Sequence, residues 1–120
     1  MTLKQALEAA TKAFHGDRER VTATLVFSGD EFFFQGHFPE RPLLPAVVQV
    51  GAVTHFASRA QGRELRLAEV RRAKFTSPVG PGVELRLAIT LEEAEEGLMK
   101  ASARITDGEV EIAELSLRLR

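Results

Sequence analysis

The feature that most constrains this chain is a proline-rich arm followed at once by an apolar segment. Pro39, Pro42 and Pro45 are spaced three residues apart, and the segment AVVQVGAVTHFASRA (46–60) follows them. Proline fixes its own φ and pushes the preceding residue toward extended backbone, so residues 39–45 are predicted to form a stiff, non-helical arm. Pro45 suits the start of a helix, where a missing N–H costs nothing. The arm therefore predicts a helix that begins at Ala46, with His37 held at a fixed distance from its N-terminus.

The predicted helix at 46–60 is apolar on nearly every face. A helix without a polar stripe is usually surrounded by protein, so we expect this one to pass through the core. Gln61-Gly62-Arg63 is expected to end it, since glycine favours the residue after a helix.

The other segments predict one more helix and several strands. Apolar residues at helical spacing, from Leu3 to Phe14, predict a helix over 3–14. Thr2 and Gln5 form a capping-box signature at its start, Gly16 lies at its end, and we expect this helix to carry little functional information. Asp107-Gly108 is a tight-turn signal. Alternating or β-branched segments predict strands at 20–28, 65–75, 83–92, 98–106 and 109–119, and the aromatic segment 32–34 predicts a short strand. Strands packed on a single long helix predict the α+β class.

Composition excludes several classes of protein. A chain of 120 residues is expected to be one domain, 1–120, and a net charge of −1 argues against a nucleic-acid partner. The absence of cysteine excludes disulfides and thiolate metal sites, and the three histidines lack metal-ligand spacing, so we expect no metal and no cofactor. No signal peptide or uninterrupted run of about 18 apolar residues occurs. We therefore expect a soluble, cytoplasmic protein without a membrane partner.

Two motifs resemble those of the hotdog-fold β-hydroxyacyl-ACP dehydratases. Gly36-His37-Phe38-Pro39, with Pro42, Pro45 and Val47, matches the family pattern GHFPxxPxxPGVLxxEA. The segment KFTSPVGPG (74–82) is similar to the family's KFxxPVxPG. The resemblance extends from about residue 20 to the C-terminus. It implies a hotdog fold, a curved antiparallel sheet wrapped around one central helix, and a homodimer with each acyl tunnel at the interface.

The resemblance gives His37 a catalytic role that fits its chemistry. Dehydration of a 3-hydroxyacyl thioester requires a base for the α-proton, and histidine titrates near neutral pH. Negative charge then develops on the thioester oxygen, and amides at a helix N-terminus can stabilise it. The resemblance assigns this oxyanion role to the Ala46 N–H, where the family has glycine. The alternative is a structural histidine beside a proline turn, but the surrounding motif favours catalysis.

Gly51 is where the sequence departs from the family. The family carries a glutamate or aspartate here, which protonates the departing hydroxyl and works with the partner subunit's histidine. Loss of a general acid typically lowers the rate by about 10²–10⁴. His55 lies four residues later on the same helix face and is a candidate replacement, although a structural histidine is the alternative. Gln49 can hydrogen-bond a substrate but cannot serve as an acid.

The predicted function is a dehydratase-like protein that acts on, or binds, an acyl-ACP or acyl-CoA thioester. The resemblance does not distinguish fatty-acid, polyketide and aryl-polyene synthesis. Alternatives are a hotdog thioesterase and a non-catalytic acyl-binding subunit that lends His37 to a second hotdog protein supplying the acid. A basic run (Arg59, Arg63, Arg71, Arg72 and Lys74) either steers an acidic carrier protein or is a solvated strand edge. The residues expected to line the acyl tunnel are Phe34, Gly36, Phe38, Pro45, Val47 and Val48.

Overall fold

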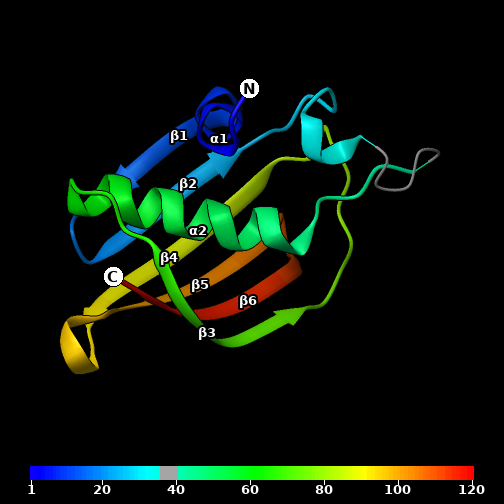
Figure 1. The fold of residues 1–120 in the computed structure, drawn as a ribbon. Helices are drawn as coiled ribbons and strands as arrows, with labels where there is room; N and C mark the ends of the chain where they lie inside the picture. Colours follow the sequence, from blue (N-terminus) through cyan, green and yellow to red (C-terminus); the bar gives the residue numbers. More distant parts are fainter. Residues whose placement is uncertain (36–40) are drawn as a thin grey trace.

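The computed structural model, which describes residues 1–35 and 41–120, has a curved antiparallel sheet around one long helix (Figure 1). The six strands of the described residues lie in the order β1-β2-β4-β5-β6-β3. This arrangement confirms the predicted α+β hotdog architecture. The elements are α1 (Leu3–Ala10), β1 (Thr11–Gly16), β2 (Arg20–Leu25), the 3-10 helix η1 (Phe32–Phe34), α2 (Ala46–Gln61), β3 (Leu67–Phe75), β4 (Leu85–Glu93), the 3-10 helix η2 (Glu95–Gly97), β5 (Met99–Asp107) and β6 (Val110–Leu119).

Helix α2 begins at Ala46, as predicted, and its inner face forms the centre of the core. Val53, Phe56 and Ala57 are fully buried, and the helix packs against β2, β4 and β5. Gly62 ends the helix in the left-handed region at φ 70°, which glycine adopts without steric cost.

The expectation that protein surrounds α2 on all sides is wrong for the single chain. The sheet covers one side of the helix, and Val47 on another side is 73% exposed. A curved sheet of this size can cover only part of the circumference of a helix. The apolar outer face is therefore left for other contacts.

The predicted helix over 3–14 is too long, because α1 ends at Ala10 and the chain continues as strand β1. The Thr11 hydroxyl donates to the Leu7 carbonyl oxygen at 2.7 Å, and β1 then pairs antiparallel with β2. Phe14 stacks on Phe56 of α2 with ring centroids 5.9 Å apart. Gly16 serves the β1–β2 connection instead of ending a helix, since a Cβ there would overlap the Arg20 carbonyl oxygen.

The predicted strand at 32–34 is also wrong, because these residues form the 3-10 helix η1. Phe33 and Phe34 are both buried, and both pack edge-on against Phe27, with ring centroids 5.3 and 6.1 Å apart. Neighbouring side chains of a strand point to opposite faces. The tighter turn lets both rings contact the same partner.

Strand β3 forms an edge of the sheet and hydrogen-bonds to β6 on one side. All of its residues except Ala68 are exposed, and they include the apolar side chains of Leu67, Val70 and Phe75. An exposed edge strand with apolar side chains is a surface on which another chain can pair.

No helix in the described parts of the chain is both long and apolar enough to cross a membrane.

The carboxylate of Glu31 organises the turn that precedes η1. It accepts hydrogen bonds from the Ser28 N–H at 2.9 Å, the Ser28 hydroxyl at 3.1 Å and the Gly29 N–H at 2.8 Å. Burial would raise the pKa of Glu31, but these hydrogen bonds favour the charged carboxylate and hold the pKa below its ordinary value. The turn is therefore stabilised by the ionised form.

We predict that Glu31→Gln lowers stability at neutral pH and that the difference from the natural protein disappears in acid. A carboxyl whose pKa is depressed by folding contributes stability above its unfolded-state pKa and loses that contribution as the pH falls through the folded-state value. Urea unfolding from pH 7 down into the range below 4.5, the ordinary value, measures this difference. A constant difference at every pH would contradict the prediction.

Candidate functional site

The two sequence motifs meet at the N-terminus of α2. The Leu44 N–H donates to the Val79 carbonyl oxygen at 2.8 Å, which ties the proline-rich arm to the second motif. A Cβ at Gly80 would lie 3.2 Å from the Pro42 carbonyl oxygen, so glycine permits this close approach. The arm and the second motif therefore lie side by side although they are far apart in the sequence.

The first two N–H groups of α2, those of Ala46 and Val47, come before the first N–H groups that donate hydrogen bonds within the helix. Pro45 is the N-cap residue, and its carbonyl accepts from the Val48 and Gln49 N–H groups at 3.1 and 3.3 Å. Proline offers no side-chain acceptor to cap the helix. The Ala46 N–H thus lies at the positive end of the helix dipole, where a developing anion is stabilised.

A small cavity of about 260 Å³ lies at this helix start. Pro45, Ala46 and Gln49 line it from the arm and α2, and residues 75–78 line it from the second motif. The structure therefore brings Pro45 and Ala46, two of the predicted site residues, to one cavity. Gly36, His37 and Phe38, also predicted for the site, lie outside the described residues.

Two residues predicted to line the acyl tunnel are part of the core. Phe34 and Val48 are only 4% and 3% exposed, and both belong to the buried apolar cluster. Neither lines the small cavity at the helix start or the larger groove along α2. Val47, also predicted for the tunnel, lines the larger cavity.

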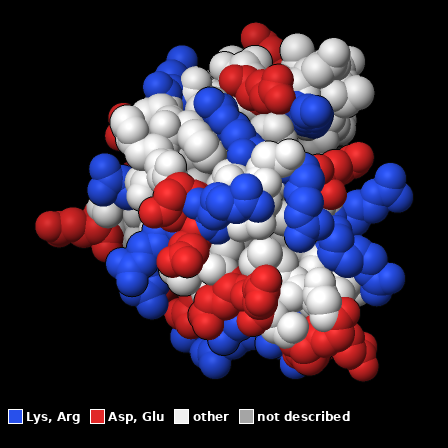
Figure 2. Space-filling model, turned by 90° about the vertical axis from the view of Figure 1, so that its left-hand side faces the viewer, with Lys and Arg blue, Asp and Glu red and all other residues white. Residues whose placement is uncertain are grey.

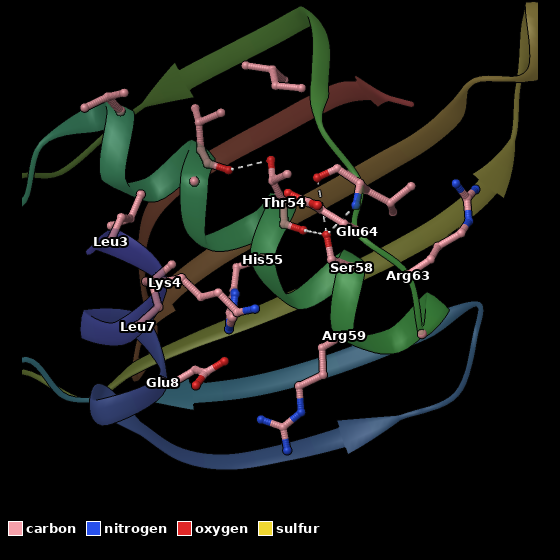
Figure 3. Close-up of a pocket in the computed structure, with 16 residues that line it drawn as sticks. Leu3, Lys4, Leu7, Glu8, Thr54, His55, Ser58, Arg59, Arg63 and Glu64 are labelled. Atoms are coloured by element: carbon pink, nitrogen blue, oxygen red, sulfur yellow. Dashed lines mark hydrogen bonds between the residues drawn. The ribbon is translucent and has the colours of Figure 1, made fainter. Parts of the chain in front are cut away.

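The larger cavity is an open groove of about 740 Å³ along the outer face of α2 (Figure 3). Helix α1 forms one wall with Leu3, Lys4, Leu7 and Glu8, and the segment 62–67 lies on the other side. The walls are largely apolar, as is usual for sites that bind small molecules. The N-terminal helix, expected to carry little functional information, is thus part of a candidate site.

Gly51 lies in the wall of this groove, directly against Leu3. A Cβ at position 51 would lie 2.7 Å from Leu3 Cδ2, closer than real side chains approach one another. Leu3 Cδ2 is the end of a rotatable side chain, so a small residue needs only a shift of Leu3, whereas a glutamate needs more room. Leu3 therefore occupies space next to the position of the missing carboxylate. No sequence signal linked Leu3 to Gly51.

His55 faces α1 from the same side of α2 as Gly51 (Figure 3). Its ring packs edge-on against Phe56 at 5.0 Å, and its Nε2 is buried without a hydrogen-bond partner in the described chain. Burial lowers the pKa of His55; Glu8 opposes this shift, and the positive charges of Lys4 and Arg59 add to it. These influences favour the neutral imidazole, which argues against its predicted use as a proton donor.

Two arginines of the predicted basic run interact with neighbouring groups. Arg71 pairs with Glu69 at 2.6 Å and with Glu95 at 2.9 Å, and the Arg59 guanidinium lies over the Phe14 ring. Figure 2 shows cationic and anionic side chains interspersed over the face in view.

Within the described residues, no group of three or more His, Asp and Glu side chains is arranged to hold a metal ion.

Comparisons with known proteins identify the family. A family model described as ApeI-like, ApeI dehydratase, matches residues 12–113. The 3-hydroxyacyl-[acyl-carrier-protein] dehydratase FabZ of Novosphingobium aromaticivorans is 35% identical over 100 residues, which cover 76% of this chain and 63% of the relative. FabZ of Polynucleobacter asymbioticus is 35% identical over 101 residues, which cover 78% of this chain and 68% of that relative.

Solved structures agree with the sequence matches in fold. A chain of the dehydratase heterocomplex ApeI:P from Xenorhabdus doucetiae superposes with a TM-score of 0.76 at 24% identity, covering 91% of this chain and 95% of that chain. This likeness shows the hotdog fold. With the family match across residues 12–113 and the FabZ relatives, it leads to one conclusion: the chain belongs to the ApeI-like group of hotdog-fold hydroxyacyl dehydratases.

Proposed function

We propose that this chain works as a (3R)-hydroxyacyl-thioester dehydratase or as one subunit of such an enzyme. The observation that carries the proposal is the junction of the two family motifs at the start of α2, where the Ala46 N–H lies at the positive end of the helix. His37 would remove the α-proton, and the Ala46 N–H would stabilise charge on the thioester oxygen. The FabZ relatives, named as acyl-carrier-protein enzymes, favour a carrier protein over CoA.

The general acid is the part of the mechanism that this chain does not supply at the family position. Gly51 has no side chain, Leu3 fills the adjacent space, and the neutral form of His55 is favoured. A catalytic site built from two chains resolves this difficulty. One chain would contribute His37, and a hotdog partner with a carboxylate would contribute the acid.

The edge strand β3 is the surface we propose for pairing with the partner. Its outer edge carries backbone groups that β6 does not use, and its exposed apolar side chains would be buried by a second sheet. A second copy of this chain would give a homodimer in which both subunits have Gly51 and lack the family carboxylate. A different hotdog chain gives a heterodimer, and the similar ApeI:P assembly of Xenorhabdus doucetiae is itself a dehydratase heterocomplex.

We predict that His37→Ala abolishes the conversion of a short 3-hydroxyacyl carrier-protein thioester to the enoyl thioester. Loss of a general base typically lowers the rate by about 10²–10⁴. Mass spectrometry of the carrier-bound product measures the conversion, with and without a carboxylate-bearing hotdog partner. His15→Ala, a change at an exposed histidine on β1, serves as the matched control. Equal rates for the natural protein and His37→Ala would contradict the proposed role of His37 as the base.

We predict that Gly51→Glu supports activity without a partner only when combined with Leu3→Ala. The glutamate needs the space that Leu3 occupies, so the double variant should exceed Gly51→Glu by about tenfold or more in enoyl formation. Leu3→Ala alone is the control for loosening of α1. Equal activity of Gly51→Glu with and without Leu3 would contradict the steric explanation.

We predict that Val70→Lys weakens subunit association. Val70 is on β3, and burying a lysine charge in a sheet interface is unfavourable. Sedimentation velocity should show a shift from dimer toward monomer. Val110→Lys is the matched control, because Val110 is similarly exposed but lies at the β5–β6 turn, beyond the residues that pair with β3. A dimer as stable in Val70→Lys as in Val110→Lys would rule out pairing through β3.

A further inference from the structure

Gln49 has a buried side-chain amide whose polar atoms lack good hydrogen-bond partners. Only 5% of the residue is exposed, and its Oε1 has no hydrogen-bond partner in the described chain. Its Nε2 lies 3.5 Å from the Leu44 carbonyl oxygen, at the outer limit of a hydrogen bond. A buried acceptor without a donor destabilises a fold, so its presence requires an explanation.

Gln61 on the same helix shows how a structural glutamine is held. It is also buried, at 9% exposure, and its Nε2 donates to the Arg18 carbonyl oxygen at 2.6 Å. That bond joins the end of α2 to the β1–β2 connection. Gln49 makes no comparable tie, so stabilisation of the fold does not account for it.

The position of Gln49 relates it to the candidate site. Gln49 and Ala46 both line the cavity of about 260 Å³ at the N-terminus of α2. Residues three apart on a helix are neighbours, about 4.5 Å apart along the axis. A ligand group held at the Ala46 N–H therefore has the Gln49 amide within one helical turn.

We propose that Gln49 is a specificity-determining residue whose Oε1 accepts a hydrogen bond from the 3-hydroxyl of the acyl chain. This inference rests on the proposed function, which brings the thioester carbonyl to the Ala46 N–H. The 3-hydroxyl is two carbons from that carbonyl, and it is the hydrogen-bond donor of that part of the substrate. The weak Nε2 contact leaves the amide free to turn toward the cavity.

The enoyl product lacks this hydroxyl, so Gln49 would favour substrate over product. A site built to hydrogen-bond a hydroxyl discriminates strongly against a ligand without it, because its own polar group is then left unpaired. The Gln49 Oε1, which has no hydrogen-bond donor in the free chain, would gain one from the 3-hydroxyl in the substrate complex.

The experiment compares Gln49→Leu with Gln61→Leu in binding and in thermal stability. The probes are amide-linked 3-hydroxyhexanoyl-pantetheine and hexanoyl-pantetheine, and isothermal titration calorimetry measures their binding to the 120-residue chain. The natural protein and Gln61→Leu should prefer the hydroxylated ligand by about tenfold or more, and Gln49→Leu should bind both equally. Gln49→Leu should keep or raise the melting temperature, whereas Gln61→Leu should lower it. Gln49→Met provides a second variant should the leucine fail to fold.

The outcomes separate this inference from the proposed function. Preference for the hydroxylated ligand that depends on Gln49, without any turnover, would support the inference and count against the dehydratase. Turnover with a preference unchanged in Gln49→Leu would overturn the inference and leave the dehydratase standing. A melting temperature that falls in Gln49→Leu as far as in Gln61→Leu, with the preference retained, would show a structural amide and overturn it too. Equal or absent binding of both ligands by the natural protein would also overturn it.

Discussion

The rest of the structure depends on burial of the inner face of α2. Val53, Phe56 and Ala57 are fully buried where the helix packs against β2, β4 and β5. Removing side chains of this size from water supplies much of the stability of a small domain. The same packing fixes the helix axis, and with it the position of the Ala46 amide. The chemistry at the helix start is therefore positioned by apolar contacts about two to three turns away.

The outer face of α2 remains partly exposed, whereas the inner face is buried. Once the sheet has covered the inner side, apolar residues such as Val47 remain exposed, and α1 covers only part of the remaining surface. Together with the exposed edge of β3, this leaves two adjoining surfaces that a second chain or an acyl group can bury. A helix that is apolar all round indicates a partner as well as a core.

The sequence predicted well those features that local chemistry determines. Pro45 predicted the start of α2, Gly62 its end, and Asp107-Gly108 the β5–β6 turn. It failed where a distant contact decides between two locally acceptable structures. The apolar spacing that suggested a longer first helix persists to Phe14, but Phe14 packs on Phe56 from a strand. Three consecutive phenylalanines suggested a strand, yet two of them share one partner, Phe27.

The candidate site was predictable to the extent that it lies in the motifs. Their order in the sequence indicated Ala46 and the missing carboxylate at Gly51. The unsatisfied state of the Gln49 amide and the contact between Leu3 and Gly51 depend on tertiary packing, which no spacing in the sequence reveals.

The contact between Leu3 and Gly51 has a practical consequence for handling the protein. Leu3 is two residues from Met1, which is 79% exposed, so polypeptide joined ahead of Met1 emerges beside the groove. An affinity tag fused there would compete for the apolar wall or pull α1 away from it. Ligand measurements are therefore best made after any tag fused ahead of Met1 has been removed.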